Sequence, residues 1–256
     1  MIATASDGAQ LASVVRWRDG ERCEVEDWLT EEVPIALEFN GVSHAVMLAT
    51  PADLEDFALG FGLSEGILDS AADLYGCEVV HSEQGITVQM DVSSRTFVAL
   101  KGRRRTLAGR TGCGVCGTES LDQVLRPVAV VRAGVPVHAS AVARAMREMH
   151  DRQVLCRATG AVHAAAWCAT DGEVLVVRED VGRHNALDKL IGATARAVAR
   201  DGFIAVTSRA SVEMVQKAAT ADASLLAAIS APTLLAVHTA KAAKMSLVGL
   251  ARQGNL

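Results

Sequence analysis

The chain has 256 residues, a formal net charge of −5 and a hydrophobic content of 50%. This length allows one large domain or two smaller ones, each with a core of its own. The negative charge and an aromatic content of only 4% argue against nucleic-acid binding, which needs basic surface and stacking side chains.

Three features of the sequence indicate a cytoplasmic protein. No apolar run approaches the roughly 18 residues that a membrane span needs. The amino terminus lacks the basic start and apolar stretch of a secretory signal. The six cysteines form no disulfide-like framework, which favours a reducing compartment.

The first half of the chain is predicted to be a small α+β domain over residues 21–120, preceded by an irregular amino terminus over residues 1–20. Two apolar runs flank Asn40-Gly41, a pair that tolerates the positive φ angles of a tight turn, and so predict a hairpin. Pro51 is expected at the first position of a helix that Gly66 ends. The strands expected in this half are 22–28, 33–39, 42–50, 77–82, 86–92 and 95–100.

The second half, over residues 121–256, alternates strands with helices and shows no internal repeat. Strands are expected at 162–169, 173–177, 203–207, 224–229 and 246–250, and helices at 140–157, 187–200, 212–221 and 233–244. Elements that alternate at these lengths indicate an α/β fold, a layered sheet with helices on both faces. The boundary between the two halves lies between about residues 105 and 135.

The stretch Gly109–Gly117 holds two cysteines, Cys113 and Cys116, among four glycines. Glycine loses the most backbone freedom on ordering, so this stretch predicts a loop that presents two thiols. Four arginines just upstream favour the thiolate, which is the reactive form. They are Arg103, Arg104, Arg105 and Arg110.

Other roles for this cysteine pair are less consistent with the sequence. A structural zinc site needs four ligands, and no second pair exists, because the remaining cysteines are scattered singly. A thioredoxin-type redox pair belongs where a strand runs into a helix, which the flanking glycines fit poorly. A structural disulfide is not favoured in the cytoplasm. The scattered cysteines are Cys23, Cys77, Cys156 and Cys168.

Three further stretches lie where a strand ends and a helix or loop follows, and open α/β sheets bind ligands at such places. Arg178–Lys189 packs charged residues, a histidine and an asparagine together. A helix cap by Asp180 or Asn185 explains one or two of them. A phosphate at the helix amino terminus, with Arg183 and Lys189 as counter-charges, explains more of the cluster. His184 is the candidate for proton transfer because its intrinsic pKa lies near neutrality.

The other two stretches carry weaker signals. In Thr207–Met214 either serine can be a helix cap, whereas the fork of Arg209 matches a phosphate or a purine edge, and both interpretations stay open. His163 begins an apolar strand and is interpreted as a core or second-shell residue. It does not fit the zinc motif of nucleobase deaminases, which needs H-x-E before its P-C-x-x-C.

Together these motifs resemble the FdhD family, accessory sulfurtransferases required for formate dehydrogenase. The similarity spans about residues 25 to 252. Its matching stretches are Asn40-Gly41 with Thr50-Pro51, Ala58–Phe61, Arg110–Gly117, Arg178–Leu190, Ser208–Ala218 and Ser230–Thr233.

The resemblance implies a persulfide carrier. Sulfane sulfur would pass from a cysteine desulfurase to Cys113, assisted by Cys116, and then to the molybdenum of the bis(molybdopterin guanine dinucleotide) cofactor before its insertion into the catalytic subunit of formate dehydrogenase. The resemblance also implies a homodimer and a three-layer α/β/α domain similar to the cytidine deaminase fold, without its zinc. A guanine nucleotide is expected to mimic the bound cofactor.

The cofactor-binding residues that the resemblance and the turns suggest lie in three stretches of the second half: Gly182, Arg183, His184 and Asn185; Ser208 and Arg209; and Leu250, Ala251, Arg252, Gln253, Gly254 and Asn255. The family often carries an aromatic residue at position 250 and a longer, more basic tail. It also usually has a glycine where Ala161 stands. A non-catalytic cofactor chaperone is the alternative function, and a zinc hydrolase is a third.

Overall fold

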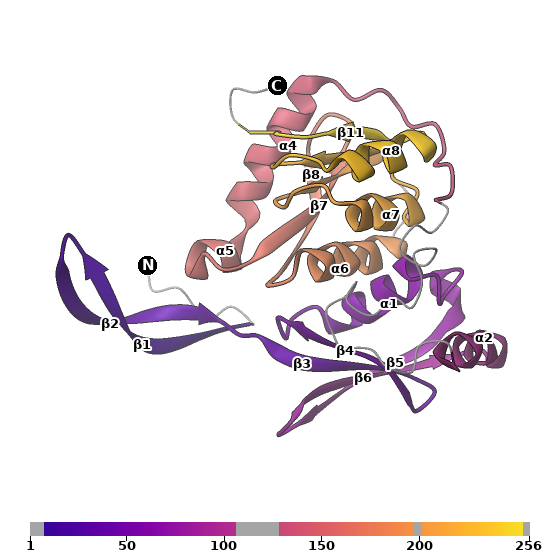
Figure 1. The fold of residues 1–256 in the computed structure, drawn as a ribbon, viewed down its shortest axis with the longest axis horizontal. Coiled ribbons are helices and arrows are strands. Elements are labelled where there is room, and N and C mark those ends of the chain that lie inside the picture. The colour runs from indigo at the N-terminus through magenta and orange to yellow at the C-terminus, as the bar shows by residue number, and fades with distance from the viewer. Residues whose placement is uncertain (1–7, 106–127, 197–200, 253–256) are drawn as a thin grey trace.

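The computed structural model describes residues 8–105, 128–196 and 201–252. These residues form a two-stranded hairpin, a four-stranded sheet and a five-stranded sheet, with helices packed on the two larger sheets (Figure 1). None of the helices in the described ranges is long and apolar enough to cross a membrane.

The hairpin is an arm that projects from the body of the molecule (Figure 1). Strand β1 (Ala9–Arg18) pairs with β2 (Glu21–Thr30) along the full length of both strands. The turn between them is Asp19-Gly20, with φ angles of 52° and 87°. The prediction of an irregular segment over residues 1–20 is therefore wrong for Ala9–Arg18. The missed signal was Asp-Gly, a preferred pair for tight hairpin turns.

The four-stranded sheet has the order β4-β3-β6-β5. Alternate residues of β3, such as Ile35 and Leu37, face α1 in one apolar core with Phe57 and Phe61. The predicted hairpin around Asn40-Gly41 is confirmed. The strands are β3 (Val33–Phe39), β4 (Val42–Ala49), β5 (Leu74–Ser82) and β6 (Gly85–Val92), and the helical elements are α1 (Leu54–Ser64), the 3-10 turn η1 (Ala71–Asp73) and α2 (Ser94–Arg105).

Two predictions in this half were wrong. Helix α1 begins at Leu54, so Pro51 lies before the helix and not at its first position. Residues 95–100 belong to α2 and not to a strand. The hydroxyl of Ser93 accepts a hydrogen bond from Thr96 N (3.1 Å), and the buried Thr96 and Leu100 are four residues apart, which is a helical spacing.

The five-stranded sheet has the order β11-β10-β9-β7-β8. Strands β9, β10 and β11 are parallel to one another, and β7 is antiparallel to both of its neighbours. All five predicted strands are present, as β7 (His163–Ala169), β8 (Val174–Asp180), β9 (Gly202–Val206), β10 (Leu225–Ala228) and β11 (Ser246–Val248).

This sheet lies between two layers of helices. Residues of α4 such as Met149 pack with Ala164 and Ala166 on one face, whereas Leu190 and Met214 pack with Ala165 on the other. Alternate residues of β7 thus face opposite layers, and the expected α/β arrangement with helices on both faces is present (Figure 1). The helices are α4 (Ala139–Arg152), α5 (Val154–Thr159), α6 (Arg183–Ala195), α7 (Val212–Thr220) and α8 (Leu234–Ala242).

Boundaries differ at two helices of this half. The helix predicted over 140–157 is divided at Gln153 into α4 and α5. Helix α6 begins at Arg183, four residues before the predicted start at residue 187. The boundary proposed at residues 120 and 121 falls outside the described ranges, and the similarity to the cytidine deaminase fold stays a prediction.

The two halves meet where α1 crosses α6 (Figure 1). A Cβ atom on Gly60 of α1 would collide with the carbonyl oxygen of Asp188, and one on Gly192 of α6 would collide with the carbonyl oxygen of Asp56. Each helix therefore contributes a glycine that lets the two backbones touch. This contact holds the smaller sheet in a defined position next to the five-stranded sheet.

Candidate functional site

The carboxyl ends of four strands meet along one edge of the five-stranded sheet, which we call the carboxyl edge. Strands β8, β9, β10 and β11 point the same way, since β7 is antiparallel to both β8 and β9. The turns that follow these strands contain the residues predicted from the sequence, and His163 at the start of β7 lies at the same edge. Ligands of open α/β sheets bind at such an edge.

Backbone hydrogen bonds join these turns into one row. Thr207 N donates to Ala164 O (3.0 Å), and Ala164 N donates back to the hydroxyl of Thr207 (2.8 Å). Thr233 N donates to Ala210 O (3.0 Å), which connects the turn after β10 to the turn after β9.

The last turn continues this row. Leu250 N donates to Ser230 O (3.1 Å), and Arg252 Nε donates to Ile229 O (3.1 Å). The predicted stretches at 207–211 and 250–252 thus belong to one continuous surface, although about 40 residues separate them in the sequence.

Three helices begin at the carboxyl edge. The hydroxyl of Thr233 caps α8 by accepting from Ala236 N (3.2 Å). Gly182 and Ser211, which precede α6 and α7, make no side-chain cap hydrogen bond. The first turn of α6 therefore keeps backbone N–H groups for other acceptors, and the helix dipole favours an anion there. In α7 the carboxylate of Glu213 already lies in the first turn.

Much of the charged stretch Arg178–Lys189 holds the fold together. Arg178 pairs with Asp56 of α1 (2.7 Å), and the carboxylate of Glu179 accepts from Leu155 N (2.9 Å) at the start of α5. Asp180 and Lys189 form a 2.7 Å ion pair with both side chains at 0% exposure. The interpretation of Lys189 as a counter-charge for phosphate is therefore wrong.

The interpretation of a helix cap by Asp180 or Asn185 is wrong, because α6 has no side-chain cap hydrogen bond at its N-cap residue, Gly182. Backbone N–H groups outside the helix are instead bound by Asp180. Its carboxylate accepts from Gly182 N (2.7 Å) and from Thr50 N (3.0 Å). Asn185 is 3% exposed and donates to Leu48 O (2.9 Å) and to Asp180 (3.0 Å). These bonds tie the start of α6 to the end of β4, so the amide nitrogen of Asn185 is already engaged within the fold.

Of the charged stretch, Arg183 and His184 each keep a nitrogen atom that can still bind a ligand. Arg183 Nε and His184 Nε2 are buried atoms without a hydrogen-bond partner among the described residues. A buried polar atom left in this way calls for a partner. Both residues lie in the first turn of α6, beside its free backbone N–H groups.

Burial and the charges around this turn move the pKa of His184 away from the near-neutral value that made it the candidate for proton transfer. Burial, followed by the positive charges of Arg183 and Lys217, lowers the pKa of His184 to about 4. The imidazole is therefore neutral at pH 7, and proton transfer by His184 near neutral pH no longer follows from the intrinsic pKa of histidine. An anionic ligand placed beside His184 would raise this pKa.

Two residues at the carboxyl edge, Glu213 and His163, were not assigned to a ligand site from the sequence, and His163 was interpreted as a core residue or a support for one. Burial alone would raise the pKa of Glu213, but hydrogen bonds from Ser211 and from its own backbone N–H, with the positive charge of Arg183, outweigh it, and the net pKa is lowered. Burial and then Arg183 lower the pKa of His163. Glu213 and Lys217 are one helical turn apart on α7, and this spacing was the signal available for Glu213.

The remaining predicted residues differ in what they can offer a ligand. Arg209 is exposed, whereas Ser208 is 4% exposed and donates to Arg209 O (3.0 Å). Leu250 is 45% exposed at a positive φ of 57°, and the side chain of Ala251 is fully buried. Gln253, Gly254 and Asn255 lie outside the described residues, as do Cys113 and Cys116. The assignment of these residues to cofactor binding and catalysis stays a prediction.

The described cysteines differ in reactivity. Burial, followed by Glu55, raises the pKa of Cys77 to about 11, and burial, followed by Glu148, raises that of Cys168 to about 12. Burial also raises the pKa of Cys156. These thiols are protonated at neutral pH and are poor nucleophiles. Cys23 is exposed on the arm. No group of three or more potential metal ligands occurs within the described ranges.

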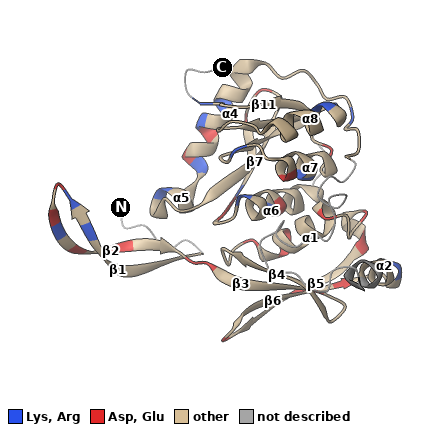
Figure 2. Ribbon diagram, in the orientation of Figure 1, with Lys and Arg blue, Asp and Glu red and all other residues tan. Residues whose placement is uncertain are grey.

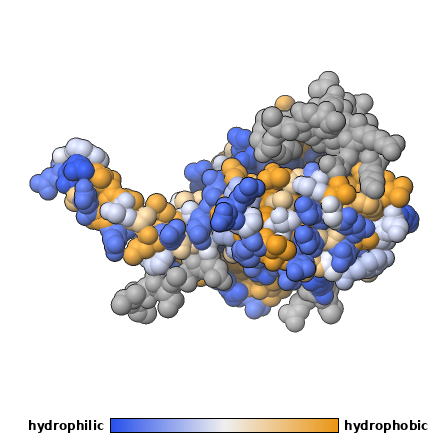
Figure 3. Space-filling view, turned by 90° about the horizontal axis from the view of Figure 1, so that it is seen from below, coloured by the Kyte–Doolittle hydropathy of each residue, from blue (hydrophilic) through white to orange (hydrophobic). Residues whose placement is uncertain are grey.

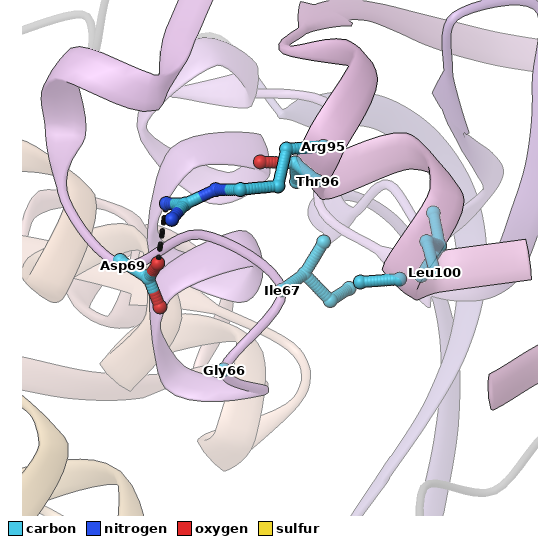
Figure 4. Close-up of a pocket in the computed structure, with 7 residues that line it drawn as sticks. Gly66, Ile67, Asp69, Arg95, Thr96 and Leu100 are labelled. Carbon is cyan, nitrogen blue, oxygen red and sulfur yellow. Dashed lines mark hydrogen bonds and ion pairs between the residues drawn. The ribbon is translucent and has the colours of Figure 1, made fainter. Parts of the chain in front are cut away.

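A small cavity lies apart from the carboxyl edge, between α2 and the end of α1 (Figure 4). Its volume is about 90 Å³, and an exposed ion pair between Arg95 and Asp69 (3.1 Å) crosses it. Pockets for drug-sized ligands measure about 300–1,000 Å³. This cavity is therefore too small for a nucleotide.

The chain belongs to the FdhD/NarQ family, whose model matches residues 30–256. It is 57% identical to the sulfur carrier protein FdhD of Variovorax paradoxus over 97% of this chain and 90% of that protein. It is 56% identical to the sulfur carrier protein FdhD of Cupriavidus necator over 94% of this chain and 85% of that protein.

A crystal structure from Desulfotalea psychrophila, described as a candidate formate dehydrogenase accessory protein, has the same fold. The TM-score is 0.74, with coverage of 96% of this chain and 94% of that chain. The sequence identity is 22%, so this likeness concerns the fold alone.

Proposed function

We propose that this chain is a sulfur carrier that holds sulfane sulfur as a persulfide on Cys113. The observation that carries the proposal is its 56–57% identity, over 94–97% of its length, to proteins named as sulfur carriers. In the loading step the Cys113 thiolate attacks the terminal sulfur of a desulfurase persulfide. A new S–S bond forms on Cys113, the S–S bond of the desulfurase breaks, and its cysteine leaves as a thiolate.

The acceptor in this proposal is the molybdenum of the bis(molybdopterin guanine dinucleotide) cofactor, which is the substrate of the carrier and enters formate dehydrogenase afterwards. This role requires two partners, a cysteine desulfurase and the catalytic subunit of formate dehydrogenase. The sulfur transfer would take place in the cytoplasm. Cys116 assists the transfer from Cys113.

Features of the carboxyl edge support binding of a guanine dinucleotide. Its phosphates need N–H donors and positive charge, which the uncapped start of α6 with Arg183, and the exposed Arg209, offer. The unpartnered Arg183 Nε and His184 Nε2 fit this role. A neutral His184 can donate one hydrogen bond and accept another without changing the charge of the site.

Sulfur loading provides the test. After incubation with a cysteine desulfurase and free cysteine, a peptide that contains Cys113 is expected to gain the mass of one sulfur atom. Cys113→Ala abolishes this gain and the activation of formate dehydrogenase. Cys23→Ala is the matched control, because Cys23 is exposed but far from the predicted loop in the sequence, and it should load as the wild type does.

The same variants separate the carrier from a non-catalytic cofactor chaperone. A chaperone would still activate formate dehydrogenase with Cys113→Ala and Cys116→Ala, and would fail with Arg209→Ala, which removes an exposed guanidinium at the carboxyl edge. Sulfur loading on Cys113→Ala equal to the wild type would disprove the assignment of the nucleophile.

A further inference from the structure

The four-stranded sheet β4-β3-β6-β5 has two different faces. Its inner face carries alternate residues, such as Leu37 of β3 and Val88 of β6, that share one apolar core with α1 and with Leu100 of α2. The residues between them point to the opposite side of the sheet, which we call the outer face. Figure 3 views the molecule from the side on which this sheet lies, where hydrophobic and hydrophilic patches alternate.

An apolar strip crosses the outer face. Val46 of β4 pairs with Ala36 of β3, which also pairs with Thr87 of β6. Thr87 pairs in turn with Val80 of β5. Val46 and Val80 are 53% and 39% exposed, and Leu48, two residues after Val46, is 56% exposed. An exposed apolar strip that spans a whole sheet is typical of a surface that binds another protein.

The next row of the outer face is acidic. Glu38 of β3 pairs with Gln89 of β6, and Gln89 pairs with Glu78 of β5. Asp91 lies two residues further along β6 and so points to the same side. Glu78 and Asp91 are exposed, and Glu38 is half-buried. These carboxylates give the surface beside the apolar strip a negative potential.

The sequence around this sheet contains no cation that could balance the acidic row. Residues 23–94 hold 15 aspartate and glutamate residues and no lysine or arginine. Figure 2 accordingly shows no blue on strands β3 to β6. Near α1, Asp56 and Glu65 are paired with Arg178 and Lys217 of the other half. The acidic row of the outer face has no such ion pair within the described ranges, so its charge is available to a cationic partner.

We propose that the outer face of the four-stranded sheet is the docking surface for the sulfur donor, a cysteine desulfurase, which binds it through a surface rich in lysine and arginine. The inference rests on the proposed function, because the donor must bring its persulfide to Cys113. Strand β6 leads directly into α2, and Cys113 follows the end of α2 by eight residues. A chain of that length spans at most about 30 Å. The thiol is therefore tethered to the half of the molecule that carries the outer face.

The position of the outer face also suits a donor better than an acceptor. The carboxyl edge, where the cofactor is proposed to bind, belongs to the five-stranded sheet. A donor on the outer face leaves that edge free. The acidic row steers a cationic partner towards the sheet, an effect that salt screens. The apolar strip loses water on contact and slows dissociation.

Binding of a cysteine desulfurase to the full chain, measured by isothermal titration calorimetry, tests the acidic row. The double variant Glu78→Lys with Asp91→Lys should raise the Kd at least about tenfold, and wild-type binding should weaken as salt is added. Glu173→Lys with Asp201→Lys is the matched control. It makes the same change of charge at two exposed positions next to the five-stranded sheet and should leave the Kd unchanged.

Leu48→Ala tests the apolar strip without changing the charge. It shortens an exposed side chain and should raise the Kd by about fivefold or more, chiefly through faster dissociation. Val154→Ala is its control, since Val154 is 54% exposed on α5 and should leave binding intact. Unchanged far-UV circular dichroism and thermal midpoints would show that all of these variants fold.

Sulfur loading from two donors separates docking from the reactivity of the thiol. Glutathione persulfide needs no protein surface: the Cys113 thiolate takes its terminal sulfur, the S–S bond of the donor breaks, and glutathione leaves as a thiolate. The outer-face variants should load from glutathione persulfide at the wild-type rate. From the desulfurase they should load with a raised KM and an unchanged kcat.

Three outcomes would overturn the proposal. The first is unchanged desulfurase binding in the outer-face variants. The second is equally slow loading from both donors, which would mean that the outer face holds the chain's own segment around Cys113. The third is a loss of binding to the catalytic subunit of formate dehydrogenase in place of the desulfurase. A wild type that binds the desulfurase through this face but takes no sulfur on Cys113 would instead reject the proposed function and leave the docking surface standing.

Discussion

His184 is half-buried, with its Nε2 atom buried, and it lies beside the positive charge of Arg183, so the pKa of its imidazole is lowered. Its pKa of about 4 reflects burial first and the neighbouring Arg183 and Lys217 second. A group inside the fold that resists protonation makes stability depend on pH. The unfolded chain, in which the pKa of histidine is about 6.5, takes up the proton first as the pH falls.

We therefore expect His184 to destabilise the protein on acidification through its pKa range. Between pH 7 and pH 5 its contribution should lower the free energy of unfolding by about 2 kcal/mol, with the loss growing until the pH reaches about 4. His184→Gln removes this part of the pH dependence, as denaturant titrations at both pH values would show.

His81→Gln, at an exposed position on β5, is the control and should leave the slope of stability against pH unchanged. An equal slope in the wild type and in His184→Gln would contradict the lowered pKa.

At the scale of elements, the crossing of α1 and α6 depends on two glycines without room for a side chain. Gly60→Ala would drive a methyl group into the carbonyl oxygen of Asp188, which cannot move without shifting the backbone of α6. We expect Gly60→Ala to lower the free energy of unfolding by about 3 kcal/mol or more. Chemical denaturation would measure the loss.

Gly62→Ala is the control for this crossing. Its Cβ would meet Cδ1 and Cγ of the Leu68 side chain at 2.7 and 2.9 Å, and a side chain shifts at a lower cost than the backbone carbonyl that Gly60→Ala would meet. A smaller loss is therefore expected for Gly62→Ala. Equal losses would show that helix propensity, and not the close contact, controls stability at these positions.

The sequence predicted most elements because their signals are local. Alternating apolar residues and the Asn40-Gly41 pair are sufficient for the β3–β4 hairpin. The arm was missed because its strands bury little, so the apolar alternation that identifies a half-buried strand is weak and only Asp19-Gly20 marks the turn. The α1–α6 contact was not predictable, since it joins residues more than 120 positions apart.

The candidate site was predicted only in part, because its turns have local signals whereas its tertiary contacts do not. Turns after strands are visible in the sequence, and the structure brings those at 182–185, 207–211 and 250–252 to one edge. The sequence did not show which residues of Arg178–Lys189 make structural contacts and which stay available for a ligand. It depends on Thr50, Asp56 and Leu155, which reach this stretch only through the tertiary fold.

At the scale of the whole molecule, a buried charge cluster links three helices. Lys217 of α7 donates to both carboxylate oxygens of Asp188 on α6 (2.9 Å) and to Ser64 of α1 (2.8 Å), and it pairs with Glu65 (3.1 Å). Burial raises the pKa of Asp188. Because the cluster spans both halves of the chain, its loss should weaken them together.

We predict one cooperative unfolding transition, with circular dichroism and tryptophan fluorescence reporting the same midpoint. Lys217→Met leaves Asp188, which is 2% exposed, without its cation and should lower the free energy of unfolding by about 3–5 kcal/mol at pH 8. The deficit should shrink at pH 5, because a buried carboxyl group with a raised pKa takes up a proton in the folded state and no longer carries an unpaired charge.

Lys241→Met, at an exposed position on α8, is the matched control and should change stability little at either pH. Two separate transitions in the wild type would mean that the halves unfold independently in spite of the shared cluster. A deficit in Lys217→Met that stays constant from pH 8 to pH 5 would mean that Asp188 remains ionised without its partner. The first result would remove the buried cluster as the link between the two halves, and the second would contradict the raised pKa of Asp188.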